Sequence, residues 1–488
     1  MSRFDAKDFE ILFPGVFTDR ERALAEEYIA RNRSLADRGD VDIRALAKGA
    51  LPEDTPGLGP PVPVAEDMVR YNNAKYDPEN PILNDAEYAR RLGYPNILAM
   101  PCFGAHDDTF MVPFPPEARD TLLVSQLNHS VTNHRPVHPG DTLRMVADSR
   151  TVTDLTPSEG SIFRSLVLRT EGRVYNQRGE KVNDCVWRVM ESMKTFKPGR
   201  RPESFGFADT WDAPAWTARP AHRYTDQDWE FIVEVWSKER RQGATPLYWE
   251  DVNIGDEPAW TADGPLDDPV LPTAPFGQGT GGSRTLKREI MDPERRRLLI
   301  RGEADGIYRT PRREDQVPPV PENPGTAVEI PAFEGDGAID TTDIHKTVAG
   351  ARSPLVNFYG RDLALRHISN WMGDHGWLHN VRWGLMPAPT MAAYGKPVPT
   401  NPDGVRFLDV VPHMRGRYAD SHGMTTDLAL VRSYVYDKHV LDGRFLVDLA
   451  WWIEAITGEI WLEGGATVIL PTKRVTWGFI QPQEGSAN

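Results

Sequence analysis

Two parts of the chain share the same order of segments, and this internal repeat limits the possible folds more than any other feature of the sequence. In each part a helix-like segment precedes several long β-rich runs, and a tight polar turn interrupts the runs at residues 176–180 and again at residues 455–459. Runs of this kind around a glycine-containing turn predict antiparallel strands. Because a repeated order of elements indicates a repeated structural unit, we predict an α+β fold with two tandem copies, each an antiparallel sheet wrapped around a central helix.

The 488 residues are enough for two or three domains. We place the first copy, with a helical segment before it, in residues 1–215. Residues 216–338 are expected to hold a connecting helix, the start of the second copy and a long insert rich in proline and glycine, and residues 339–488 the C-terminal copy. An insert of this length is typical of a lid, a binding loop or an interface cover, and an exposed linker is the alternative.

Three helices have clear start signals. One is expected to begin at Thr18, one to run from Thr225 to Gly243, and a short one to follow Asp292. The second has an apolar stripe that includes two tryptophans, which we expect to pack in the core.

The composition indicates a globular protein of the cytoplasm. Hydrophobic residues make up 40% of the chain, and no apolar run approaches the roughly 20 residues that a membrane-spanning helix needs. The formal net charge of -15 argues against nucleic acid as a partner, because phosphate backbones require a basic surface. With only Cys102 and Cys185, and no apolar block after a positive N-terminal end, we expect neither export nor a cysteine-ligated metal.

Several motifs together resemble the MaoC-like double hot-dog hydratases and dehydratases of acyl-CoA. The first copy carries YDPENPILNDAEYARRLGYPNILAMP, HRPVHPGDTL and NQRGE, and the second carries ERRQGATPLYWEDVNIGDE, NFYGRDLALRHISNWMGDHGWL and LVDLAWWIEAITGEI. The resemblance covers roughly residues 65 to 480. It implies a tandem hot-dog fold, R-specific interconversion of an enoyl-CoA and a 3-hydroxyacyl-CoA, no metal or redox cofactor, and a possible homodimer.

In that family, the aspartate and histidine of the signature Asp-x-Asn-Pro-Ile-His activate a water molecule. The first copy reads DPENPIL, which has Leu83 where the histidine would be, so the resemblance implies that this copy is catalytically silent. The second copy reads DTTDIH, with Asp340 and His345 at the family's separation. One carboxylate and one imidazole that touch the same water can exchange protons with it and with the α carbon. We therefore predict Asp340 and His345 as the catalytic pair.

The enolate oxygen of such a reaction needs hydrogen-bond donors, which the amino end of a helix supplies. The segment after Gly360 has apolar residues near helical spacing, and Gly373 can end it. We expect this segment to be the central helix, with Gly360 at its start, where the resemblance implies a close approach of the ligand to the backbone. Tyr359 and Arg361, on either side, are predicted to contact the substrate.

Other readings of the polar residues stay open. Asp374 and His379 are also five apart, but they follow the expected helix, so a turn and a solvent- or strand-facing position are favoured for them. His129, His134 and His138 are clustered, yet no cysteine or carboxylate joins them at ligand spacing, so we predict no metal site there.

Two other functions fit the same resemblance. A hot-dog acyl-CoA thioesterase would hydrolyse the thioester, and a non-catalytic acyl-CoA-binding subunit would have lost activity through its altered Thr-Thr-Asp-Ile loop. Arg361, Arg366 and Arg382 are candidates for the phosphates of coenzyme A, although arginines on helices and strands are usually solvated. The sequence defines no acyl group.

Overall fold

The computed structural model describes Ala23 and residues 26–30, 61–104, 122–154, 164–193, 221–266, 284–309, 339–340, 357–384, 406–419, 423–424 and 426–474. Within the first expected helix, residues 26–30 are helical, whereas Thr18 lies outside the described residues. None of the described helices is long and apolar enough to cross a bilayer.

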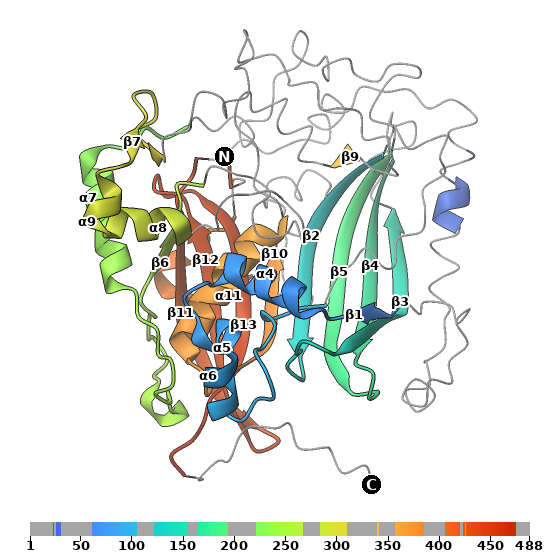
Figure 1. The fold of residues 1–488 in the computed structure, drawn as a ribbon. Coiled ribbons are helices and arrows are strands. Elements are labelled where there is room, and N and C mark those ends of the chain that lie inside the picture. The colour runs from blue at the N-terminus through green and yellow to red at the C-terminus, as the bar shows by residue number, and fades with distance from the viewer. Residues whose placement is uncertain are drawn as a thin grey trace.

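The first copy is an antiparallel sheet in the order β1-β3-β4-β5-β2 (Figure 1). Three helices, α4 to α6, stand between β1 and β2 in the sequence. The bounds are β1 Val62–Pro63, α4 Glu66–Tyr76, α5 Pro81–Asn84, α6 Ala86–Arg91, β2 Leu122–Asn133, β3 Thr142–Asp154, β4 Arg164–Tyr175 and β5 Lys181–Met193.

The second copy has the corresponding order β6-β11-β12-β13-β10, with helix α11 between β6 and β10 in the sequence. The bounds are β6 Thr261–Asp263, α11 Asn357–Met372, β10 Trp377–Gly384, β11 Ala429–Leu441, β12 Arg444–Glu454 and β13 Ile460–Ile469. Since each strand of one copy has a counterpart at the same place in the other, the predicted tandem double hot-dog fold is confirmed.

The two copies join through β2 and β10, which pair antiparallel with Val131 opposite Val381. Corresponding strands therefore meet at the centre of one continuous sheet, and an approximate twofold axis relates the copies. A short strand, β9 (Ile339–Asp340), pairs parallel with β2 near the other end of β2.

The two polar turns connect equivalent hairpins, β4–β5 and β12–β13. In each turn, the first residue donates its backbone N–H to the carbonyl of the last, at 3.0 Å in residues 176–180 and 2.9 Å in residues 455–459. Gly179 and Gly458 have φ of 74° and 91°, a left-handed conformation that glycine adopts without a steric penalty. The antiparallel hairpins predicted from these turns are confirmed.

Helix α11 ends where the sequence predicts and begins earlier. Gly373 follows its last residue with φ of 68°, as expected for a glycine that ends a helix. Its first residue, Asn357, precedes Gly360 by three positions. The helix is enclosed by the second sheet and by the first copy, and Leu363, Ala364 and Ile368 are at most 2% exposed. A helix that is buried on most sides is usually apolar around its circumference, but α11 also buries the charged residues Arg361, Asp362 and Arg366.

The remaining helices cover the β6 edge (Figure 1). Thr225 caps α7 (Asp226–Lys238) in a capping box with Asp228, and Asp292 caps α9 (Pro293–Arg296), as predicted. Helix α7 ends five residues before Gly243, because the backbone of Glu239, with φ of -54° and ψ of 138°, is no longer helical. The other elements are η3 Trp249–Asp251, α8 Arg284–Met291, β7 Ile300–Arg301, β8 Tyr308–Arg309, η5 Phe407–Val410 and η6 Pro412–Met414.

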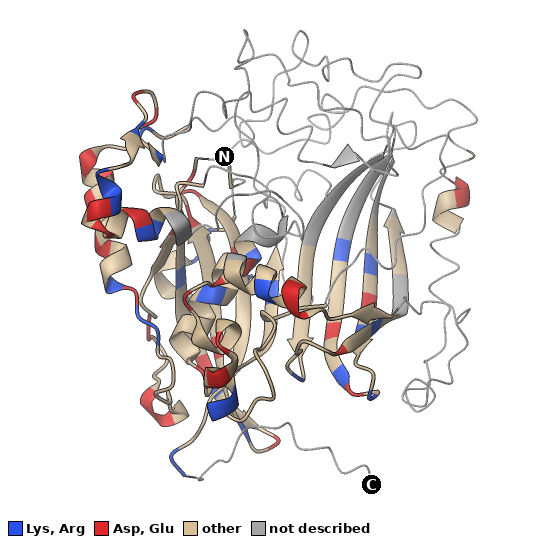
Figure 2. Ribbon diagram, in the orientation of Figure 1, with Lys and Arg blue, Asp and Glu red and all other residues tan. Residues whose placement is uncertain are grey.

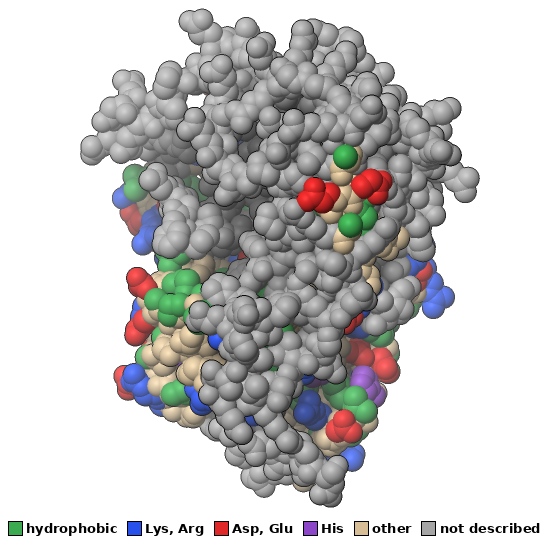
Figure 3. All heavy atoms as spheres, turned by 90° about the vertical axis from the view of Figure 1, so that its right-hand side faces the viewer, with side chains coloured by type: hydrophobic (Ala, Val, Ile, Leu, Met, Phe, Trp, Pro, Cys, Tyr) green, Lys and Arg blue, Asp and Glu red, His purple; other side chains and the backbone are tan. Residues whose placement is uncertain are grey.

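Charged residues of both signs are interspersed along α7 to α9 (Figure 2). On the face turned toward the viewer in Figure 3, the described side chains that are visible also mix acidic, basic and hydrophobic groups.

Candidate functional site

A small apolar cavity of about 90 Å³ lies between the two copies. The first copy contributes the loop with Asn80, Ile82 and Leu83, and the second contributes the end of α11 and the start of β10. The first-copy loop in which the sequence resembles the dehydratase signature thus lies in the wall of a cavity.

Local hydrogen bonds fix that loop. The Asn80 side chain accepts the N–H of Ile82 at 3.2 Å and caps the short helix α5, and the Asn84 side chain donates to the carbonyls of Asp77 and Asn80 at 2.9 Å. Leu83 is 3% exposed and puts an alkyl side chain where the family has an imidazole. This position therefore supplies no titratable group to the cavity.

Asp77, the aspartate of the same signature, is fully buried and lines neither this cavity nor the one described next. Its two carboxylate oxygens each lie 2.8 Å from Nη2 of Arg241, which follows α7. A carboxylate held by a guanidinium in this way fixes the two copies to each other.

A second, polar cavity of about 340 Å³ adjoins the first. Side chains of both charge types and several imidazoles line it, among them His134, His138, His379, Arg135, Arg178, Glu180 and Arg444. The two cavities share part of their walls: Tyr94, Asn133, Arg135, Pro136 and Trp377. An apolar space and a polar space thus lie next to each other at the carboxyl end of β2.

The imidazoles of the polar cavity differ in their partners. His134 lies with Nε2 2.6 Å from a carboxylate oxygen of Asp184, and its ring meets the ring of His379 edge-on at 6.3 Å. Burial lowers the pKa of His379 to about 4, so this ring is neutral at pH 7. Burial also lowers the pKa of His138, whose Nδ1 lies 3.0 Å from the carbonyl oxygen of Ile97.

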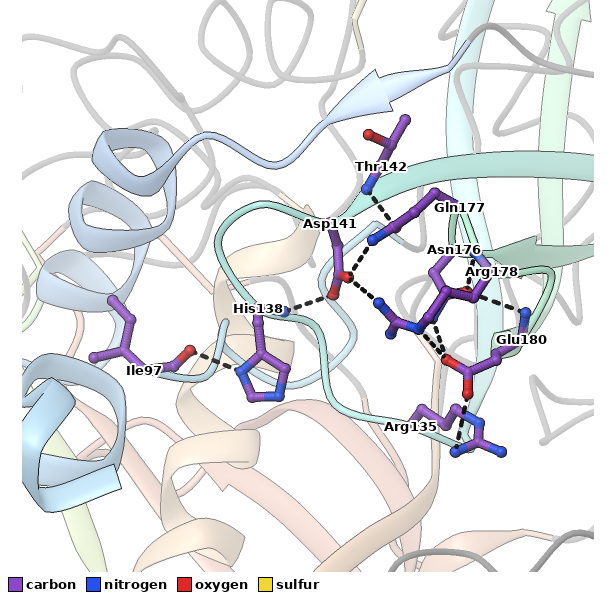
Figure 4. Close-up of polar contacts among 9 residues, drawn as sticks. All are labelled: Ile97, Arg135, His138, Asp141, Thr142, Asn176, Gln177, Arg178 and Glu180. Carbon is purple, nitrogen blue, oxygen red and sulfur yellow. Dashed lines mark hydrogen bonds and ion pairs between the residues drawn. The ribbon is translucent and has the colours of Figure 1, made fainter. Parts of the chain in front are cut away.

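An ion-pair network joins the turn at 176–180 to the loop before β3 (Figure 4). Arg178 donates from Nε to Glu180 at 2.7 Å and lies 3.3 Å from Asp141, which also accepts the N–H of His138 at 3.0 Å. Arg135 lies 3.6 Å from Glu180. The network holds one wall of the polar cavity in place.

Asp374 and His379, the alternative pair, line different cavities. Asp374 lies in a turn, as the sequence favours, faces the apolar cavity and accepts a 2.5 Å hydrogen bond from the hydroxyl of Tyr88. Burial and this carboxylate raise the pKa of Tyr88 to about 12. His379 lies on β10 and lines the polar cavity.

Of the predicted catalytic pair, the structure describes the backbone of Asp340, which lies toward the amino end of β2. The backbone of Asp340 pairs opposite Val124, nine residues before Asn133, which is about 30 Å along a strand. His345 lies outside the described residues, as do the side chains of Asp340 and Tyr359.

The approximate twofold axis relates the first-copy cavities to the region around Asp340. Asp184 lies four residues after the first polar turn and pairs with Thr132 near the end of β2. Its equivalent in the second copy is Glu463, which lies four residues after the second turn and pairs with Gly384 at the end of β10. Gly384 in turn pairs with Asn128 of β2, four residues from the position opposite Asp340. Strand β9 therefore runs close to the position in the second copy that corresponds to the cavities of the first.

Glu463 is a residue of this region that the sequence analysis missed. Its side chain is 5% exposed and accepts the N–H of Ala419 at 3.2 Å, and burial raises its pKa to about 7. A carboxyl group that is half ionised at neutral pH is typical of functional sites, although structural groups also show it.

Gly360 lies in the first turn of α11 but faces protein. A Cβ atom on this residue would overlap Cδ2 of Leu462 and would lie 3.2 Å from the Trp461 ring. The missing side chain therefore lets α11 pack closely against β13, which differs from the predicted close approach of a ligand.

The arginines of α11 are enclosed. Arg361 is 7% exposed, donates to Asp362 at 2.8 and 2.6 Å, and lies over the Trp383 ring at 5.6 Å. Arg366 is 1% exposed and forms an ion pair with Asp263. Buried guanidinium groups that already have carboxylate partners are poorly placed for phosphates, so this burial argues against the predicted contacts of Arg361 and Arg366 with a substrate.

The three clustered histidines separate in the fold. His129 is buried and stacks on Trp383 at 5.2 Å, whereas His134 and His138 line the polar cavity. Among the described residues, Asp437, His439 and Asp448 have potential ligand atoms within 4.8 Å of one another. This group is on β11 and β12 and lines neither cavity, and exposed acidic groups often occur without an ion.

The matched family model covers residues 61–185 and is described as "FAS1-like, dehydratase domain region". A comparison with curated proteins gives no significant match. The match on residues 61–185 supports a protein of the hydratase or dehydratase kind.

Three similar solved structures span both copies. They are a MaoC-like dehydratase (14% identity, 85% of this chain and 96% of that chain, TM-score 0.42), a putative MaoC domain protein dehydratase from Chloroflexus aurantiacus J-10-fl (13%, 85% and 94%, 0.40), and a conserved hypothetical protein with a double hot-dog fold from Mycobacterium tuberculosis (12%, 84% and 94%, 0.40).

Proposed function

We propose that the protein adds water to an enoyl thioester, or removes it from the 3-hydroxyacyl thioester, with coenzyme A as the carrier. The observation that carries this proposal is the pair of adjoining cavities that the segment matching the dehydratase domain region forms together with the second copy. A thioester of this type has an apolar acyl end and a polar, phosphorylated carrier end, so it needs an apolar and a polar space side by side.

Catalysis in the second copy is assigned to Asp340 and His345. The carboxylate and the imidazole would take a proton from water and deliver one to the α carbon. The N–H groups at the amino end of α11, that of Gly360 among them, would stabilise the enolate oxygen. The position of β9 beside the twofold counterpart of the first-copy cavities supports this assignment.

The experiment offers the protein a panel of enoyl-CoA substrates. Hydration of each substrate is measured as the loss of the ultraviolet absorbance of its conjugated double bond. Hydration lowers this absorbance without releasing a thiol. A thioesterase would release free coenzyme A instead, and a non-catalytic subunit would do neither. Failure of all enoyl-CoA substrates with the purified, folded protein would refute the proposal.

The variants Asp340→Asn and His345→Ala test the catalytic pair. Each is expected to lower the second copy's rate by about 100-fold or more, because a general acid–base group contributes this much. Both should leave the thermal unfolding unchanged. Wild-type rates in both variants would refute the assignment of the pair but not of the reaction.

A further inference from the structure

We infer that the first copy holds a second acid–base centre, in which His134, oriented by Asp184, exchanges protons with a thioester substrate bound across the two cavities. This inference rests on the proposed function. It assigns catalysis to a copy whose signature has lost its histidine, and it places the imidazole on strand β2 instead of on the loop.

The geometry of the His134–Asp184 pair orients the imidazole. Nε2 of His134 lies 2.6 Å from Oδ2 of Asp184, a distance typical of a strong charge-assisted hydrogen bond. A carboxylate at one ring nitrogen holds the proton there and leaves the lone pair on the other, Nδ1, as the base. This is the arrangement by which an aspartate orients a catalytic histidine.

The ring of His134 lies in the wall of a cavity. His134 lines the polar cavity, and the preceding residue, Asn133, lines both cavities. The imidazole therefore lies in the wall of the polar cavity, next in sequence to a residue that both cavities share, and the inference places the acyl end of the thioester in the apolar cavity. By contrast, His222 and Asp228 form a similar pair at 3.0 Å that lines neither cavity. The cavity, and not the ion pair alone, distinguishes His134.

Charged and polar groups surround the His134–Asp184 pair. Lys181 lies 2.9 Å from Asp184, His379 contributes a neutral ring at 6.3 Å, and Arg444 lines the same cavity. Arg135 lines both cavities, so its guanidinium is placed to balance negative charge on the thioester oxygen.

The reaction then balances without a further reagent. Nδ1 of His134 takes one proton of water as the oxygen bonds to C3 of the enoyl group. The electron pair of the C2–C3 double bond moves onto the thioester oxygen, and C2 then takes the proton back from the imidazolium. The sum is the addition of one water molecule.

The match to the dehydratase domain region agrees with this assignment. It ends at residue 185 and so includes both His134 and Asp184, and it falls on the copy with Leu83 in its signature. A copy that performs this chemistry without the signature histidine needs another imidazole at the cavity.

The test measures hydration in the His345→Ala protein, in which the second copy is disabled. Adding His134→Ala is expected to lower the remaining rate by about 100-fold, and free imidazole should restore part of it, because the removed ring leaves room for the free base. A purely structural role of His134 predicts no rescue by imidazole. His222→Ala is the matched control at a His–Asp pair outside the cavities, and it should keep the rate.

Each outcome decides between the claims. If His345→Ala alone removes all hydration, or if His134→Ala changes nothing in that background, the inference is refuted and the proposed function stands. If the wild-type protein hydrates no enoyl thioester, the proposed function fails as well. Thermal unfolding of every variant shows whether a lost rate reflects a lost fold.

Discussion

Arg241→Met should destabilise the protein by leaving the Asp77 carboxylate buried without its partner. Both oxygens of Asp77 lie 2.8 Å from Nη2 of Arg241, and the Asp77 side chain is 0% exposed. Removing one member of a buried ion pair typically costs 3–5 kcal/mol, because the other charge stays in a low-dielectric site. The Arg241 side chain is 21% exposed, and Arg366 is close enough to interact with Asp77, so we expect about 3 kcal/mol, the lower end of that range.

Urea unfolding followed by tryptophan fluorescence measures this loss. Arg70→Met is the matched control, because it removes the same type of side chain from an ion pair with Glu66 whose members are 45% and 51% exposed. The control should change the free energy of unfolding by less than about 0.5 kcal/mol.

The double variant Asp77→Asn/Arg241→Met tests the cause. If the penalty comes from an uncompensated charge, the double variant should be more stable than Arg241→Met alone. A loss of less than about 0.5 kcal/mol in Arg241→Met, or a double variant that is less stable than either single one, would refute the reasoning.

Two further changes test the packing and the electrostatics of the second copy. Gly360→Ala should destabilise the fold by about 1 kcal/mol. Crowding of the new methyl group against Leu462 and Trp461 costs about 1–3 kcal/mol, while alanine regains about 1 kcal/mol of helix propensity. A variant that is more stable than wild type in urea unfolding would contradict this. The pKa of Glu463 is raised from about 4.5 to about 7 in the folded protein, so between these pH values the folded state keeps a proton that the unfolded state loses. The stability that the protonated Glu463 side chain contributes is therefore complete below about pH 4.5 and lost by about pH 7. At about 1.4 kcal/mol for each unit of pKa shift, the effect is at most about 3 kcal/mol. The free energy of unfolding of Glu463→Gln relative to wild type should rise by up to that amount between pH 4 and pH 8. A difference between the two proteins that does not change with pH would contradict this.

The sequence by itself determined the architecture, because the signals for the architecture are local. A glycine with a left-handed backbone marks each polar turn, Thr225 and Asp292 cap the helices that follow them, and Gly373 ends α11. Each signal acts within a few residues of the chain, and the same turn and strand order occurs twice. The resemblance to double hot-dog proteins could therefore be read from motifs without knowledge of any contact between distant residues.

The tertiary structure decided which polar side chains meet. Asp77 and Arg241 are 164 positions apart, and His134 and Asp184 are 50 apart and meet only because β2 and β5 pair with Thr132 opposite Asp184. Strand order and register set such contacts, and a shift of one residue would turn every side chain of a strand to the other face. The enclosure of Arg361 and the close packing at Gly360 likewise depend on how α11 packs on the second sheet, for which the helix sequence has no local signal.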